Sequence, residues 1–224
     1  MIAPRDAEFR LYATLTGNTM GAVPFSNDFR RLHFGTQRKQ VEPTPEVQDG
    51  AERMVSTQLY RDGMARVAAA VHIVTTDGPA GSAGFTASAA CSVTDDPPTL
   101  LVCLNRASQL HSIFQKNGVF CLNTLTADQQ VLSELFARQG GMPMQERFAM
   151  PVWETGKTGA PALRDALACF DCRITEVKEV GTHWVLFGEV QEIRMSSGTS
   201  ALLYLHRAYR TLSLLKQRRE KDRE

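Results

Sequence analysis

Two long segments on either side of Gly181 limit what this chain can fold into more than any other feature. Residues 166–180 (ALACFDCRITEVKEV) and 183–195 (HWVLFGEVQEIRM) are rich in β-branched and aromatic residues, and the glycine between them permits a tight turn. The pattern predicts a hairpin whose arms are long for a two-layer sandwich. Such long, curved arms favour a β-barrel.

Shorter strand segments precede this hairpin. Residues 69–78 end in an Asp-Gly-Pro turn, and residues 81–106 contain two strand-like runs, a Pro-Pro break and a third run, which indicates an antiparallel sheet. Helical patterns at 108–117 and 127–137 interrupt the strands instead of alternating with them. We therefore expect a mainly β fold, a barrel with helical insertions, in preference to a doubly wound parallel sheet.

Capping signals mark the ends of the expected helices. Ser108 is placed to begin one helix and Gly118 to end it, and Thr126 with Gln129 has the spacing of a capping box before the next. A further helix is expected to begin with Thr57 as its cap. Its apolar residues recur at the spacing of one buried helix face: Tyr60, Met64, Val67 and Ala68.

The chain is expected to divide into three parts. Residues 1–57 hold four of the ten prolines and show little periodicity, which predicts a poorly structured arm. Residues 58–213 carry the strand and helix signals of one globular domain. Residues 214–224 are mostly charged, which is typical of a solvated tail.

Composition argues against several classes of partner. Lys and Arg number 25 and Asp and Glu number 24, a net charge of +1, so no broad basic field is available to attract nucleic acid. No stretch reaches the roughly 18 apolar residues of a membrane helix, and the N-terminus lacks the apolar core of a secretory signal. We expect a cytoplasmic protein without a nucleic-acid or membrane partner.

The five cysteines are expected to be reduced thiols. Most lie in apolar runs, and Cys169-x-x-Cys172 falls in a strand, whose period of two sends the two side chains to opposite faces. A redox pair requires the geometry of a turn or a helix start, and no second cysteine pair completes a zinc site. The histidines show no metal-ligand spacing either, so no metal is expected.

Common catalytic motifs are missing from the sequence. It contains no G-x-G-x-x-G after a strand, no P-loop, no G-x-S-x-G and no H-E-x-x-H. Gly78, Gly81 and Gly84 do form G-x-x-G-x-x-G between two expected strands, where a flexible hairpin loop is favoured over a phosphate cradle.

Three further segments are candidates for a site. Residues 84–92 (GFTASAACS) have small side chains at strand positions where large apolar residues are usual. Either a flat ligand binds against the exposed backbone there, or a helix packs against the strand. Residues 105–108 (NRAS) could bring amides, a hydroxyl and a guanidinium to an anion, or form an ordinary helix cap with a surface arginine. His183, beside the Gly181 turn, could face a ligand, although solvent is favoured.

Taken together, these segments resemble the flavin reductase family, whose fold is the FMN-binding split β-barrel. The resemblance spans Tyr60 to Leu212 and rests on blocks in family order: YRDGMARVAAAVHIVTT, AGFTASAACSVTDDPPTLLVCLNRAS, Arg147-Phe148, GAPAL at 159–163, CFDCRI, and Gly181-Thr182-His183 before LFGEV. Many relatives carry Asp where this chain has Thr182, and this difference points to the branch of the family linked to pyrimidine utilisation.

The resemblance implies a homodimer with flavin in a groove near the subunit interface, and it assigns two sets of residues to that flavin. The set near the ring and ribityl chain comprises Thr86, Ala87, Ser88, Cys91 and Ser92, and Phe148 is expected to help close the pocket. The set near the phosphate comprises Asn105, Arg106, Ser108 and His111. His183 is expected beside the nicotinamide and flavin rings, in the catalytic role.

The implied activity is NAD(P)H-dependent reduction of FMN, with the reduced flavin passed to a separate flavin-dependent monooxygenase in pyrimidine catabolism. Hydride transfer needs two aligned rings and no nucleophile, which agrees with the missing catalytic motifs. FAD or riboflavin as the flavin, and NADPH as the donor, stay open. Two alternatives are the reductase component of an aromatic (4-hydroxyphenylacetate-type) monooxygenase and a non-catalytic protein that binds flavin or haem.

Overall fold

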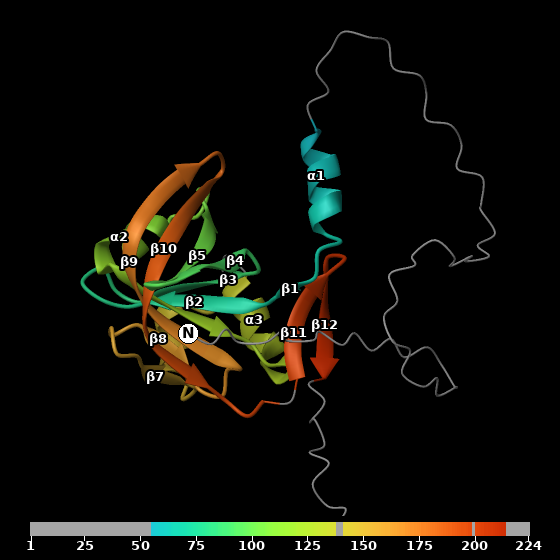
Figure 1. Cartoon of the computed structure of the whole chain (residues 1–224). Helices are drawn as coiled ribbons and strands as arrows, with labels where there is room; N and C mark the ends of the chain where they lie inside the picture. Colours follow the sequence, from blue (N-terminus) through green and yellow to red (C-terminus); the bar gives the residue numbers. More distant parts are fainter. Residues whose placement is uncertain (1–54, 138–140, 199, 214–224) are drawn as a thin grey trace, which may run out of the picture. The chain divides into compact units, whose positions relative to one another are not determined.

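The computed structural model describes residues 55–137, 141–198 and 200–213 (Figure 1). Nearly all of the expected N-terminal arm and the whole charged tail therefore lie outside the described residues. No helix in the described ranges has the length and apolar character needed to cross a membrane. The elements in chain order are α1 (Thr57–Met64), β1 (Ala69–Ala70), β2 (His72–Thr76), β3 (Ala83–Ala87), β4 (Ala90–Asp95), β5 (Pro98–Asn105), α2 (His111–Asn117), β6 (Val119–Thr124), the 3₁₀ helix η2 (Ala127–Gln129), α3 (Gln130–Ala137), α4 (Met144–Ala149), β7 (Trp153–Thr155), β8 (Pro161–Leu163), β9 (Ala168–Val180), β10 (His183–Met195), β11 (Ser200–Leu205) and β12 (Ala208–Ser213).

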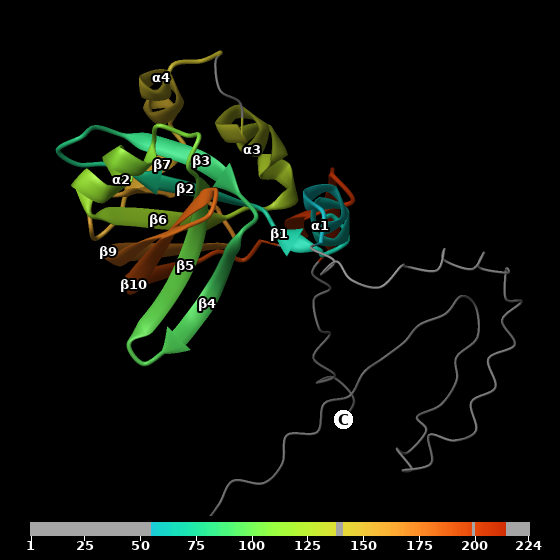
Figure 2. The ribbon, with the colours of Figure 1, turned by 90° about the horizontal axis from the view of Figure 1, so that it is seen from above.

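One curled sheet forms the body of the domain. It has seven strands in the order β3-β2-β6-β9-β10-β5-β4, and all neighbouring strands are antiparallel. The two edge strands, β3 and β4, are consecutive in the chain and are separated only by Ser88 and Ala89. A sheet with its edges joined so closely has to curl, and Figure 2 shows it from above with α3 and α4 outside it. The expected mainly β barrel with helical insertions is confirmed.

Strands β9 and β10 are the long hairpin predicted around Gly181. Val180 pairs with His183, so Gly181 and Thr182 form a two-residue turn, and the φ of 54° at Gly181 is one that glycine adopts without strain. The register of the pair shifts at two points farther along the hairpin. Such shifts bend a strand pair, and they allow these long arms to follow the curve of the barrel.

Two apolar cores lie on opposite faces of the sheet. Along β2, Ile73 belongs to one core and Val74 to the other, and along β9 the side chains of Cys169 and Cys172 divide in the same way. The prediction that these two cysteines face apart is therefore confirmed, because adjacent strand positions alternate between faces. All five cysteines are free thiols.

Helix α1 differs from its prediction in two respects. Its cap is Ser56, whose hydroxyl oxygen accepts a hydrogen bond from the Leu59 amide, whereas Thr57 is already the first helical residue. The face predicted to be buried is exposed, with exposed fractions of 61% for Tyr60, 49% for Met64 and 54% for Val67. The helical spacing identified an apolar face correctly, but no described part of this chain covers it.

Two of the four capping predictions are confirmed, whereas those for Thr57 and Ser108 are wrong. Gly118 ends α2 in a left-handed conformation with φ of 68°, and the capping box between Thr126 and Gln129 is present. Ser108 does not cap α2, which begins three residues later at His111. Its hydroxyl oxygen instead accepts a hydrogen bond from the Leu110 amide in the turn before the helix, at 3.3 Å.

The glycine-rich segment after β2 is the hairpin loop that the sequence favours. The Asn117 side chain closes it by accepting a hydrogen bond from the Ala80 amide at 2.9 Å and donating one to the Gly81 carbonyl oxygen at 2.9 Å. A Cβ at Gly78 would lie 2.9 Å from Asn117 Oδ1, so glycine is needed for this close approach. The loop is therefore closed by Asn117 rather than shaped to hold a phosphate.

Candidate functional site

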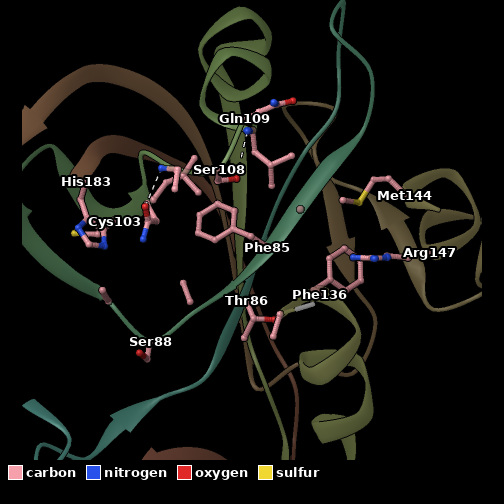
Figure 3. Close-up of a pocket in the computed structure, with 18 residues that line it drawn as sticks. Phe85, Thr86, Ser88, Cys103, Ser108, Gln109, Phe136, Met144, Arg147 and His183 are labelled. Carbon is pink, nitrogen blue, oxygen red and sulfur yellow. Dashed lines mark hydrogen bonds between the residues drawn. The ribbon is translucent and has the colours of Figure 1, made fainter. Parts of the chain in front are cut away.

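A cavity of about 680 Å³ opens beside β3 (Figure 3). One wall is β3 with the two residues that follow it, and a second is the end of β5 with the next turn. The ends of α3 and α4 form a third wall, and His183 stands at the tip of the β9–β10 hairpin. The volume falls within the roughly 300–1,000 Å³ typical of small-molecule sites.

The small residues of β3 serve both a packed helix and the cavity. A Cβ at Gly84 would lie 2.8 Å from Phe136 Cε1, so α3 packs directly on the strand there. The Thr86 hydroxyl donates a hydrogen bond to the Ser133 carbonyl oxygen of α3 at 2.6 Å. Beyond Thr86, Ser88 is exposed at the cavity. Both alternatives that the sequence leaves open are therefore realised in this one strand.

The turn after β5 uses much of its hydrogen-bonding capacity within itself. Asn105 Oδ1 accepts a hydrogen bond from the Ala107 amide at 2.8 Å, and the Asn105 carbonyl oxygen accepts one from the Ser108 amide at 3.0 Å. Asn105, Ala107 and Ser108 all line the cavity. An anion bound here would depend on side-chain groups more than on a row of open backbone amides.

Arg106, in the same turn, faces the hairpin. Its Nη1 donates a hydrogen bond to the Gly181 carbonyl oxygen at 3.0 Å, and its guanidinium forms an ion pair with Glu179 and lies over the Trp184 ring at 5.6 Å. The Arg106 amide donates to the Thr182 carbonyl oxygen at 3.0 Å. Arg106 does not belong to the lining of the cavity, and its expected place near a phosphate stays a prediction.

His183 is the first residue of β10 and lies directly across from Asn105 of β5. Its Nδ1 is 3.0 Å from Thr182 Oγ1, which leaves Nε2 as the ring nitrogen for a ligand. The residue lines the cavity and is also exposed. The solvent-facing and ligand-facing interpretations are thus compatible at this position.

In the Arg147-Phe148 pair, Arg147 lines the cavity and Phe148, expected to help close the pocket, does not. Arg147 is buried and lines the cavity, with its Nε donating to the Met142 carbonyl oxygen at 2.9 Å and its guanidinium over the Phe136 ring at 5.6 Å (Figure 3). Phe148 packs against Trp153 at 5.2 Å and lies outside the lining. Neighbouring residues on a helix point in different directions, so only one of the two can face the cavity.

The predicted site residues therefore fall into two groups. Those that the structure brings together around the cavity are Thr86, Ala87, Ser88, Asn105, Ser108 and His183. Those outside the lining are Cys91 and Ser92, which are exposed on β4, together with Arg106, His111 and Phe148. His111 stacks on Trp184 at 5.1 Å, and its Nδ1 is buried without a hydrogen-bond partner among the described residues.

Four residues that line the cavity were not predicted as site residues from the sequence: Cys103, Gln109, Phe136 and Arg147. Burial, with Cys91 nearby as a lesser cause, raises the pKa of the Cys103 thiol, so this sulfur stays protonated and is a poor nucleophile. Arg147 is the one permanently charged residue in the described lining, and a buried arginine is a signal that sequence alone does not provide. No group of three potential metal ligands occurs within the described ranges.

His72 lies behind the β3 wall, where it pairs with Ala87 across β2 and β3. The side chain is 8% exposed, and its Nδ1 is 3.1 Å from Thr124 Oγ1. Burial lowers the pKa of His72 to about 4, because the charged imidazolium is poorly solvated there. The strand behind this wall thus carries a histidine that stays neutral at physiological pH.

With this fold and cavity, the chain belongs to the flavin reductase family: residues 64–213 match the family described as flavin reductase like domain. Two similar relatives carry the name FMN reductase (NADH) RutF. The one from Enterobacter sp. (strain 638) is 54% identical over 158 residues, covering 70% of this chain and 95% of the relative. The one from Ancylobacter novellus is 52% identical over 173 residues, covering 76% and 94%.

Solved structures agree with this placement. A candidate flavin reductase from Haemophilus somnus 129PT is 49% identical, with a TM-score of 0.66 over 70% of this chain and 100% of its own. BorF, the flavin reductase component of a bacterial two-component tryptophan halogenase, is 30% identical, with a TM-score of 0.67 over 70% and 99%. The family resemblance and the split-barrel fold expected from the sequence are confirmed.

Proposed function

We propose that this chain is an NADH-dependent FMN reductase that releases reduced flavin to a separate monooxygenase in pyrimidine catabolism. The observation that carries the proposal is the cavity itself, which the small residues of β3 line together with His183. The family membership and the names of the 52–54% identical relatives support the same activity. NADH and FMN are intracellular cofactors, so the proposed location is the cytoplasm.

The residues around the cavity fit a flavin. When bound, FMN supplies the ring nitrogen N5 that accepts a hydride from C4 of NADH. The backbone and hydroxyl of Ser88, at the exposed end of the β3 wall, would bind the edge of the flat ring. Asn105 and Ser108, on the neighbouring wall, would bind the phosphate through their side chains.

His183 would orient the nicotinamide through Nε2, since Nδ1 is engaged with Thr182. The side chains of Phe136 and Met144 close the other end of the cavity and would exclude water there. Acceleration would come mainly from holding two rings in register, because proximity and orientation account for a large part of such barriers. No residue has to act as a nucleophile.

The lining also fits a flavin that binds weakly and dissociates after each turnover. Arg147 is the one permanent charge in the described lining, and it is already engaged with Met142 and Phe136. Few strong polar contacts keep affinity modest, which suits FMN as a diffusible substrate. BorF, at 30% identity, is by its title the reductase component of a two-component system, and the present chain is proposed to serve in the same way.

A homodimer is part of the proposal. The apolar face of α1 is exposed, and the end of this helix contacts the β11–β12 hairpin through a hydrogen bond from the His206 amide to the Ala65 carbonyl oxygen at 2.7 Å. The hairpin adds Tyr204, 38% exposed, and Leu212, 52% exposed. Exposed apolar side chains of this kind are typical of an interface, and the apolar face of α1 on a second copy is the proposed occupant.

Light scattering on the full chain tests the dimer. The molar mass should be twice that of one chain, and Met64→Glu, which places a charge in the middle of the apolar face, should shift it toward the monomer. A chain that elutes as a monomer at micromolar concentration would contradict this part of the proposal.

Spectrophotometric assay of NADH oxidation with added FMN tests the activity. The proposed enzyme consumes NADH only when FMN is present, and a non-catalytic flavin or haem binder consumes none. Repeating the assay with FAD, riboflavin and NADPH establishes the preferences. Adding a flavin-dependent pyrimidine monooxygenase and then an aromatic one shows which oxygenase the reduced flavin supports.

A further inference from the structure

We propose that Arg106 is a positioning residue for His183: it holds the exposed turn of the β9–β10 hairpin on the end of β5 and thereby sets where the imidazole stands over the cavity. The inference rests on the proposed function and deepens it, because it names what positions the residue that orients the nicotinamide.

The tip of the hairpin has little burial to hold it in place. Residues 178–183 are all exposed, and exposed turns open locally at a small cost in free energy. His183 nevertheless has to stand within hydrogen-bonding reach of a bound nicotinamide. A displacement of about 1 Å can reduce the rate of a positioned reaction by up to about 10²-fold. Polar contacts outside the two apolar cores therefore have to hold the tip.

Arg106 supplies these contacts from a single position. Its amide donates to the Thr182 carbonyl oxygen and its Nη1 to the Gly181 carbonyl oxygen, both at 3.0 Å. Its guanidinium also pairs with Glu179 of β9 and lies over the ring of Trp184 of β10. One side chain thus reaches both arms of the hairpin and its turn. A planar guanidinium can serve a carboxylate, a carbonyl and a ring together, which an ammonium cannot.

The ion pair alone does not explain this role. The side chains of Arg106 and Glu179 are 44% and 48% exposed, and an exposed pair contributes little by itself. Arg164 and Glu154, 52% and 47% exposed, form a comparable pair, and Arg164 also donates to the Pro151 carbonyl oxygen at 3.2 Å. Arg164 lies outside the cavity lining, and its side chain bonds Glu154 and Pro151, so it is a matched control.

Steady-state kinetics of Arg106→Gln in the full chain, with Arg164→Gln as the control, test the proposal. We expect Arg106→Gln to lower kcat/KM for NADH by about tenfold and Arg164→Gln to leave it unchanged. FMN and riboflavin should be affected equally, since Arg106 is not assigned to the phosphate. Arg106→Lys should restore little, because it keeps the charge and loses the planar contacts.

A double-mutant cycle separates positioning from a general structural effect. In a His183→Ala background, Arg106→Gln should cause no further loss of kcat/KM for NADH, because the residue through which it acts is missing. Nuclear magnetic resonance of the ¹⁵N-labelled histidines gives a readout that does not depend on activity. The ring signals of His183 should shift and broaden in Arg106→Gln, and those of buried His72 should not.

Three results would overturn the proposal. One is the same loss from Arg106→Gln with and without His183, and another is unchanged His183 ring signals. The third is a loss with FMN but not with riboflavin, which would assign Arg106 to the phosphate. An unchanged NADH turnover in His183→Ala alone would instead remove His183 from the proposed reaction, and the ring signals would still decide whether Arg106 holds the turn.

Discussion

The two sides of the cavity are built in different ways. The β3 wall belongs to the sheet and is pressed on α3, where Gly84 meets Phe136 and Thr86 bonds Ser133. The rim with His183 is an exposed turn held mainly by polar contacts. Packing is stiff and strongly coupled to stability, whereas surface polar contacts are not. Changes where the wall packs on α3 should therefore alter binding and stability, changes at its exposed end should alter binding alone, and changes at the rim should alter turnover alone.

Gly84→Val should have the largest effect. A Cβ there meets Phe136 Cε1 at 2.8 Å, so α3 would have to move away from the wall. We expect a loss of about 3 kcal/mol in the free energy of unfolding, at the upper end for overpacking, together with loss of FMN binding. Urea denaturation and flavin fluorescence measure the two. Gly63→Ala is the control, since a Cβ there meets nothing within 4 Å, and unchanged stability of Gly84→Val would contradict a stiff wall.

Ser88→Leu should separate binding from stability within the wall. Ser88 is exposed at the cavity, so a larger side chain fills ligand space without disturbing either core. The Kd for FMN should rise by at least about tenfold, equal to about 1.4 kcal/mol, while the melting temperature stays the same. Ser88→Ala keeps the space and should bind FMN nearly as well as the parent. Undiminished binding by Ser88→Leu would place the flavin elsewhere.

His183→Ala should affect turnover alone. The side chain is exposed and contributes to neither apolar core, so the free energy of unfolding should not change. We expect kcat/KM for NADH to fall by about tenfold and the Kd for FMN to stay within about twofold. Loss of stability in this variant would break the proposed distinction between wall and rim.

Acidic pH should slightly lower the stability of the sheet behind the wall, through His72. The folded-state pKa of His72, about 4, lies below its ordinary value of 6.5, so below pH 6.5 the unfolded chain binds a proton that the folded chain excludes. Stability from neutral His72 is full above pH 6.5 and is lost as pH falls toward 4. Between pH 7 and pH 5.5 the loss should be about 1 kcal/mol by urea denaturation. His72→Gln should show a smaller dependence over the same range.

Structural features that depend on a few neighbouring residues could be predicted from the sequence. The β9–β10 hairpin around Gly181, the left-handed end of α2 at Gly118 and the opposite faces of Cys169 and Cys172 all follow from local periodicity and turn chemistry. The small residues of β3 were also visible as an unusual strand. In each case, the residues that decide the outcome are neighbours in the chain.

Contacts between segments far apart in the chain could not be predicted from the sequence. Arg106 turns toward Gly181, 75 residues away, and nothing in the sequence around Arg106 indicates this direction. Which of Arg147 and Phe148 lines the cavity depends on how α4 is oriented against Phe136. The apolar face of α1 was recognised, but what covers such a face is a property of the assembly and not of the helix.

A crystal structure of the chain soaked with FMN is the most direct measurement of whether flavin binds at the exposed end of β3. We predict that the isoalloxazine ring lies along the backbone around Ser88, with one face open toward His183. A flavin bound at any other surface, with the end of β3 covered by its own side chains, would contradict the account.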